Sequence, residues 1–160
     1  MNELIQGILL ALLPALAVSI ITAYITVRLS IKQFYSQRWW DKKAEAYSQI
    51  LEHLSYLRYY YEELSDDLLR ADTTLDTDHT KSLNEGYRRS KESITKAAAV
   101  GEFIVSETTT KAISKLLSKL YKLYFENDLI KATDDSYEAV NECIKTVRKE
   151  AKEALLRIMR

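Results

Sequence analysis

The sequence contains little glycine, proline, cysteine or histidine, and each shortage excludes a class of protein. Its 160 residues include three Gly and one Pro, too few for the many turns of a β-sandwich, a barrel or a Rossmann fold. One Cys excludes a disulfide framework and a zinc finger, and two His exclude most histidine-built metal or catalytic sites. No HExxH, GxSxG or P-loop motif occurs. We therefore expect no enzyme activity, no metal and no cofactor.

The residues that are abundant favour helices. Ala, Leu, Glu, Lys, Arg and Ser dominate, which predicts an all-α fold. Basic and acidic residues balance to a net charge of zero, so the chain is not a binder of long nucleic acid. Apolar residues are concentrated in the first 31 positions, which separates the N-terminal segment from the rest of the chain.

The N-terminal segment has the length and composition of a membrane span. Leu4 to Val27 is a run of 24 residues without a charge, and as a helix it would be about 36 Å long, enough to cross a bilayer core. A signal peptide fits less well, because no basic residue precedes the run. We expect one transmembrane helix within residues 1–31, followed by a basic and aromatic juxtamembrane segment, residues 32–43. The basic residues downstream place the C-terminal side in the cytoplasm, in contact with membrane lipid.

Small residues repeat every four positions along the predicted span. A stripe of small and polar side chains lets transmembrane helices approach closely. It is either a packing seam between helices or, in its polar part, the lining of a pore. Both alternatives require a homo-oligomer, whose subunit count stays open. The stripe consists of Gly7, Ala11, Ala15, Ser19, Thr22 and Thr26.

Residues 44–160 have the periodicity of a cytosolic helical bundle. A strict heptad seam of apolar residues begins at Tyr47 and ends at Leu68. An Asp- and Thr-rich loop, residues 71–80, follows it. Further helices are predicted at about 81–105 and 109–126, where Tyr124 ends the inward-facing set, and Asp135 with Glu138 marks the start of the last helix. Four helices with short connections predict an up-down bundle.

Charged residues alternate in blocks along the predicted bundle. Residues 62–79 and 126–142 are acidic, whereas residues 28–43 and 145–160 are basic. In an up-down bundle the two acidic blocks lie at one end, and the two basic blocks lie at the other, beside the membrane, where they would attract anionic lipids.

Aromatic and basic residues are interleaved in two places. The first helix contains Tyr56 and Tyr59 to Tyr61 around Arg58, and the second helix contains Tyr87, Arg88, Arg89 and Lys91. An aromatic ring can stack on a base and Arg can hold phosphate. The same residues also suit a helix surface or a subunit contact. Tyr87, Arg88, Arg89 and Lys91 are the candidate ligand-binding residues.

The block RWWDKKAEAYSQILEHL, residues 38–54, resembles a stretch that follows the lone span of small bacterial membrane proteins. The whole layout also resembles the membrane-anchored ancillary proteins of type III CRISPR systems. That resemblance implies an oligomeric effector of the bacterial inner membrane, whose cytosolic domain binds a cyclic oligoadenylate, namely cyclic tetra-adenylate, and disrupts the membrane in antiviral defence. It implies no particular binding residue.

Two further functions remain open. The chain suits a membrane-tethered adaptor that recruits a protein partner through its helical bundle, and this function needs neither nucleotide nor pore. A constitutive membrane toxin would explain the span but would leave the large helical domain without a role.

Overall fold

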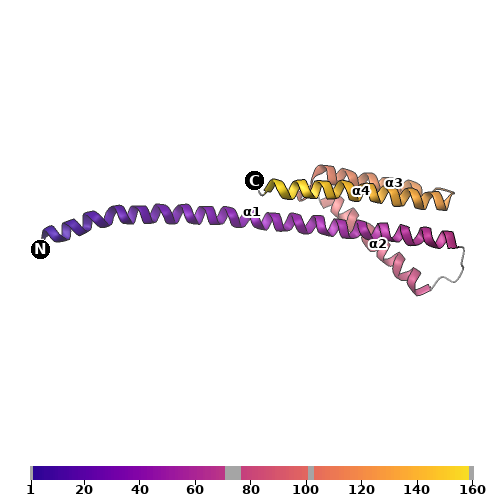
Figure 1. Ribbon diagram of the computed structural model, residues 1–160, viewed down its shortest axis with the longest axis horizontal. Coiled ribbons are helices and arrows are strands. Elements are labelled where there is room, and N and C mark those ends of the chain that lie inside the picture. Colours follow the sequence, from indigo (N-terminus) through magenta and orange to yellow (C-terminus); the bar gives the residue numbers. More distant parts are fainter. Residues whose placement is uncertain (1, 71–76, 101–102, 159–160) are drawn as a thin grey trace. The chain divides into compact units, whose positions relative to one another are not determined.

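The computed structural model describes the backbone of residues 2–70, 77–100 and 103–158, and the side chains of residues 16–69, 78–99 and 103–156. Within these ranges every regular element longer than one turn is an α-helix (Figure 1). The helices are α1 (Asn2–Arg70), α2 (Thr77–Val100), α3 (Glu107–Leu123) and α4 (Leu129–Ile158). The predicted all-α fold is confirmed. The chain divides into two units, residues 1–40 and residues 41–160.

The first unit is the N-terminal part of α1. From Leu16 to Ile31 its large apolar side chains are exposed on every face of the helix. Among the described residues, no helix has a stretch that is long and apolar enough to cross a membrane. The first half of the predicted span, residues 4–15, lies outside the side chains that the structure describes.

The stripe of small residues is described only in part. Gly7, Ala11 and Ala15 lie outside the described side chains, whereas Ser19, Thr22 and Thr26 are described and exposed. The Thr26 hydroxyl donates a hydrogen bond to the Thr22 carbonyl oxygen at 2.8 Å, an interaction that satisfies a hydroxyl within its own helix. Both alternatives for the stripe, a packing seam and a pore lining, stay predictions.

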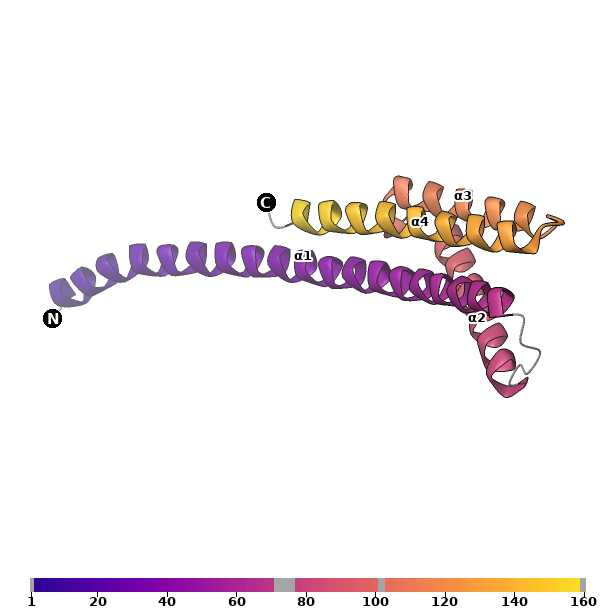
Figure 2. The same cartoon turned by 45° about the vertical axis from the view of Figure 1, so that its right-hand side comes forward.

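The second unit is an up-down helical bundle formed by residues 41–70 of α1 with α2, α3 and α4. Figures 1 and 2 both show α3 and α4 side by side and antiparallel, with α2 crossing the bundle obliquely. The bundle forms because each helix has an apolar stripe that must be removed from water. The predicted bundle of four helices is confirmed for this unit.

The core consists mainly of the predicted seams. On α1 the seam residues from Tyr47 to Tyr61 are buried, and on α4 so are Val140, Ile144, Val147 and Ala151. Tyr124 is a correction, because its side chain is 83% exposed beyond the last turn of α3. The seam of α3 therefore ends with Leu120 and the half-buried Leu123.

The starts of three helices differ from the predictions, and for α3 and α4 a side-chain hydrogen bond explains the difference. Helix α2 begins at Thr77 rather than at 81. Helix α3 begins at Glu107 because the Ser106 side chain accepts a hydrogen bond from the Thr109 N–H at 3.2 Å. Helix α4 begins at Leu129, where Asp128 Oδ1 accepts a hydrogen bond from the Lys131 N–H at 3.1 Å, instead of at Asp135.

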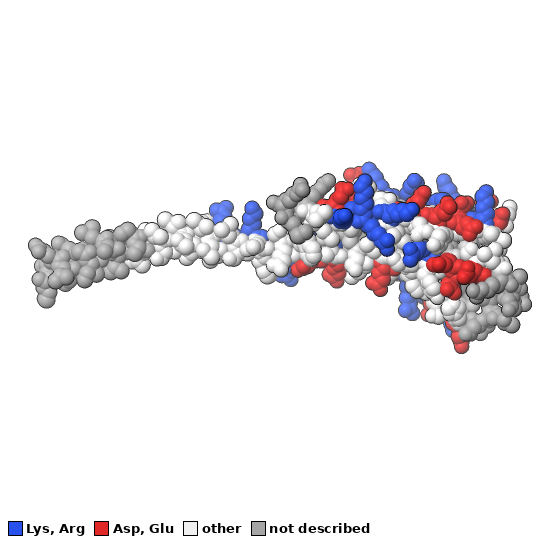
Figure 3. Space-filling view, in the orientation of Figure 1, with Lys and Arg blue, Asp and Glu red and all other residues white. Residues whose placement is uncertain are grey.

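Charge is segregated along the second unit. Figure 3 shows acidic side chains gathered toward the end where α4 begins and basic side chains farther along α4. The Ser65 hydroxyl of α1 donates a hydrogen bond to Asp134 Oδ1 of α4 at 3.4 Å. This contact brings the acidic block of α1 next to that of α4, as the up-down topology predicted. The position of the basic blocks beside a membrane stays a prediction.

Candidate functional site

A cluster of three tyrosines joins α1 to α2. The rings of Tyr60 and Tyr87 lie 4.3 Å apart between centroids, and the hydroxyls of Tyr61 and Tyr87 are 3.2 Å apart. The Tyr60 hydroxyl donates a hydrogen bond to Asn84 Oδ1 at 3.2 Å. Burial raises the pKa of Tyr60 and of Tyr61 above the usual range, so both remain neutral donors. Tyr87, one of the candidate ligand-binding residues, thus packs against two neighbours of its own chain.

The other candidate residues lie on two sides of α2. Arg88 and Lys91 line one open surface hollow with Tyr87, and Lys91 Nζ lies 5.7 Å from the centre of the Tyr87 ring. Arg89 lines a different hollow, with Tyr56, Tyr59 and His53. It also forms an exposed ion pair with Glu85 at 3.5 Å. The structure therefore brings together three of the four predicted residues and separates Arg89 from them.

The hollow around Tyr87 carries both signs of charge. Glu92 forms an ion pair with Lys96 at 2.8 Å, and the hydrogen bond and charge of Lys96, helped by the charge of Arg88, lower the pKa of Glu92. Three cations and one carboxylate leave an excess of positive charge on this face. Because the side chains are solvated, one chain alone offers a phosphate only a weak site.

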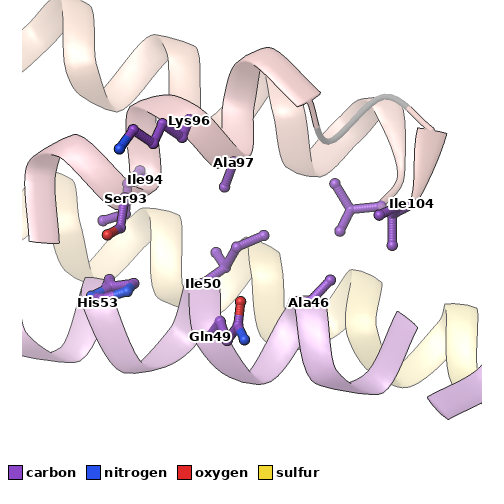
Figure 4. Close-up of a pocket in the computed structure, with 10 residues that line it drawn as sticks. Ala46, Gln49, Ile50, His53, Ser93, Ile94, Lys96, Ala97 and Ile104 are labelled. Atoms are coloured by element: carbon purple, nitrogen blue, oxygen red, sulfur yellow. The ribbon is translucent and has the colours of Figure 1, made fainter. Parts of the chain in front are cut away.

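Another hollow, absent from the sequence predictions, lies between α1 and α2. It has a volume of about 350 Å³ and is lined mainly by apolar residues of α1, α2 and the segment that follows α2. Figure 4 shows His53, Ser93 and Lys96 toward one end and Ala46, Ala97 and Ile104 toward the other. His53 Nδ1 is also 3.4 Å from the buried Ser90 hydroxyl, which fixes the ring at this end. We call this hollow the α1–α2 groove.

Exposed aromatic side chains gather at the turn between α3 and α4. The ring centroids of Tyr121 and Phe125 are 5.3 Å apart, and so are those of Tyr124 and Phe125. Leu129 and Ile130, at the start of α4, are exposed apolar side chains as well. We call these five residues the aromatic turn. The heptad pattern did not reveal it, because Tyr121 lies on the exposed face of α3 and the other four residues follow the end of the α3 seam.

Among the described residues, no group of three or more His, Cys, Asp or Glu side chains is placed to hold a metal ion. Burial raises the pKa of the Cys143 thiol to about 12, which makes it a poor nucleophile. His79 Nε2 lies 3.7 Å from a Glu63 carboxylate oxygen on the surface.

The sequence matches no protein-family model, no curated protein and no solved structure.

Proposed function

We propose that the protein is a membrane-tethered adaptor whose helical bundle recruits a protein partner through the aromatic turn. The observation that carries the proposal is the exposure of this turn. Tyr124 is 83% exposed and Phe125 is 65% exposed beside a well-packed core. Contiguous exposed apolar surface on a folded domain is typical of an interaction site, and aromatic residues contribute much of the binding energy at protein interfaces.

The tether is the uncharged N-terminal segment. Leu4 to Val27 contains no charged residue, and the large apolar side chains from Leu16 to Ile31 have no partner that buries them within the described chain. A lipid bilayer would remove this surface from water. The basic residues after the span favour a cytoplasmic bundle, and we propose a single-pass protein of the bacterial inner membrane.

The chemistry of the partner follows from the charges beside the aromatic turn. Glu126 and Asp128 lie within the turn and Lys122 and Lys131 lie on either side of it, and Figure 3 shows further acidic side chains at this end of the bundle, so acidic charge is in excess there. Anionic lipid would be repelled by these carboxylates. We therefore expect a protein partner with an apolar patch surrounded by Lys or Arg.

The tether is tested by extraction of the full chain from bacterial membranes with alkaline carbonate. We expect the protein to resist extraction. The double variant I20K/I21K should release it, because charge inside a span is costly. The matched control K32Q/R38Q keeps the apolar run and should remain in the membrane. Release of the unmodified protein by carbonate would overturn the tether without affecting the proposal for the aromatic turn.

The recruitment surface is tested by a photo-crosslinking amino acid introduced into the full chain in cells. Placed at Tyr124, it should give one discrete adduct that disappears in the variant F125D, because a buried carboxylate would disrupt an apolar interface. Placed at Tyr59, which is exposed on α1, it should not give that adduct. Equal adducts from both positions, or an adduct unaffected by F125D, would contradict recruitment through the aromatic turn.

A second candidate function has its own supporting observation. Tyr87, Arg88 and Lys91 line one hollow, and in a symmetric oligomer such cations would be repeated around an axis. We propose as the alternative an oligomeric effector that binds cyclic tetra-adenylate and disrupts the membrane in antiviral defence. Ligand binding drives such a change only through different affinities for the two states.

This alternative is tested by titrating the full chain in mild detergent with cyclic tetra-adenylate. If it is correct, R88E should weaken binding at least tenfold, whereas R89E, on the other side of α2, should leave binding nearly unchanged. Ligand should also release dye from vesicles that contain the protein. No binding heat from folded protein, or equal loss in both variants, would rule out this site.

A further inference from the structure

The α1–α2 groove separates polar from apolar side chains along its length. Ala46 and Ile50 of α1 face Ala97 of α2, and Ile104 extends the apolar wall beyond α2 (Figure 4). The groove is hollow at this point because Ala46 and Ala97 have short side chains. Its volume of about 350 Å³ falls within the range of small-molecule sites, which are mostly apolar with a few convergent polar groups.

The polar end offers donors and positive charge. His53, Ser93 and Lys96 lie toward this end, whereas Gln49 lies farther along α1, nearer Ala46 (Figure 4). Lys96 is paired with Glu92 at 2.8 Å, but both side chains are largely solvated, so the pair can open at small cost. An ammonium, a hydroxyl and an imidazole at one end of an apolar hollow match a carboxylate joined to an alkyl chain.

We propose that the α1–α2 groove binds a small amphipathic carboxylate, of the class of medium-chain fatty acids. The carboxylate lies against Lys96, Ser93 and His53, and the alkyl chain lies between Ala46 and Ala97 toward Ile104. This site is separate from the aromatic turn, and it shares Lys96 with the hollow around Tyr87. It also differs from a site for a nucleotide, which would need several cations for its phosphates.

The alkyl chain gives the proposal a quantitative signature. Each buried methylene contributes free energy that corresponds to about a fourfold gain in affinity. Octanoate should therefore bind about 15-fold more tightly than hexanoate, and the gain should stop when the chain reaches the end of the groove. Octanol should bind more weakly than octanoate, because it lacks the charge that Lys96 recognises.

The full chain in mild detergent is titrated with hexanoate, octanoate and octanol. NMR follows the methyl resonances of Ala97, Ile50 and Ile104 during each titration. We expect saturable shifts confined to these methyls. A97L should weaken octanoate binding at least tenfold by filling the groove. A99L is the matched control, because Ala99 is exposed on the same helix, and it should bind normally.

The polar end is tested with K96Q, which should weaken binding of octanoate but not of octanol. If A97L fails to fold by circular dichroism, A46L fills the groove from α1 instead. Shifts that do not saturate, shifts spread over the whole chain, or equal binding in A97L and A99L would overturn the proposal. So would equal affinity for octanoate and octanol.

Discussion

At the residue scale, the junction of α1 and α2 depends on one glycine. A Cβ atom at Gly86 would overlap the ring of Tyr56, whose hydroxyl donates a hydrogen bond to the Leu83 carbonyl oxygen at 3.5 Å. Glycine here allows a tyrosine of α1 to lie directly on the backbone of α2. Glycine at this position also destabilises α2, because glycine has a low helix propensity.

The variant G86A should therefore destabilise the protein despite its better helix propensity. Overpacking against Tyr56 costs about 1–3 kcal/mol, whereas alanine gains up to about 1 kcal/mol over glycine inside a helix. In a Y56A background the overlap is gone, and G86A should increase the free energy of unfolding. Urea denaturation of the unmodified protein, G86A, Y56A and the double variant measures how G86A changes the free energy of unfolding in each background. If G86A has the same effect in both backgrounds, the contact with Tyr56 is not the reason for the glycine.

A second residue-scale prediction concerns the hydroxyl of Tyr47. Its side chain is 2% exposed, and its oxygen accepts a hydrogen bond from the Ser106 N–H at 3.0 Å. The variant Y47F keeps the ring but leaves this N–H without an acceptor, which should lower the free energy of unfolding by about 1–2 kcal/mol. The control Y124F removes an exposed hydroxyl and should have almost no effect. Urea denaturation measures both variants. Equal effects would show that the hydrogen bond contributes nothing to the free energy of unfolding.

At the element scale, the apolar periodicity of each helix predicted its buried face, but the helix ends depended on single side chains. The α1 seam from Tyr47 to Tyr61 is buried as its spacing predicted. Helix α4 begins six residues before Asp135 because Asp128 caps it first. The sequence alone does not determine which of two equivalent capping residues starts the helix, because that depends on the geometry of the loop.

The capping of α3 can be tested directly. The Ser106 side chain accepts a hydrogen bond from the Thr109 N–H and contacts the Thr109 hydroxyl at 3.0 Å. The variant S106A should lower the free energy of unfolding by about 1 kcal/mol, and S106D should retain most of the stability because a carboxylate also accepts from this N–H. Thermal unfolding followed by circular dichroism compares the two. A loss in S106D as large as that in S106A would indicate that packing, and not capping, is involved.

The candidate sites were harder to predict than the helices. Tyr87 and Arg88 were correctly placed on α2, but the packing of Tyr87 against Tyr60 and Tyr61 depends on how α2 crosses α1, which periodicity does not define. The α1–α2 groove is lined by two alanines, Ala46 of α1 and Ala97 of α2, whose short side chains leave a gap between the helices. Small residues at seam positions are common in bundles, so only the assembled fold distinguishes a gap from a close contact.

At the scale of the whole molecule, the bundle places like charges together. The acidic ends of α1 and α4 meet at Ser65 and Asp134, and basic side chains occupy the other part of α4 (Figure 3). Such separation opposes folding through repulsion within each block. The separation gives the two ends of the bundle opposite electrostatic character, which suits the proposed adaptor, with an acidic recruitment end and a basic end attracted to lipid.

The repulsion predicts opposite responses to neutralising substitutions at the two ends. D134N removes one acidic charge yet keeps an oxygen that can accept from Ser65, so at low salt it should raise the melting temperature, by on the order of 1 °C. E150Q removes an acidic residue from the basic block of α4, near Lys149 in sequence, and should lower the melting temperature by a similar amount. Both shifts should vanish in molar salt, where the Debye length is about 3 Å. Calorimetry of the full chain in mild detergent measures both shifts in melting temperature.

Shifts of the same sign, or shifts that persist in high salt, would mean that local packing rather than charge separation determines the response. The electrostatic basis for two functionally distinct ends of the bundle would then be lost.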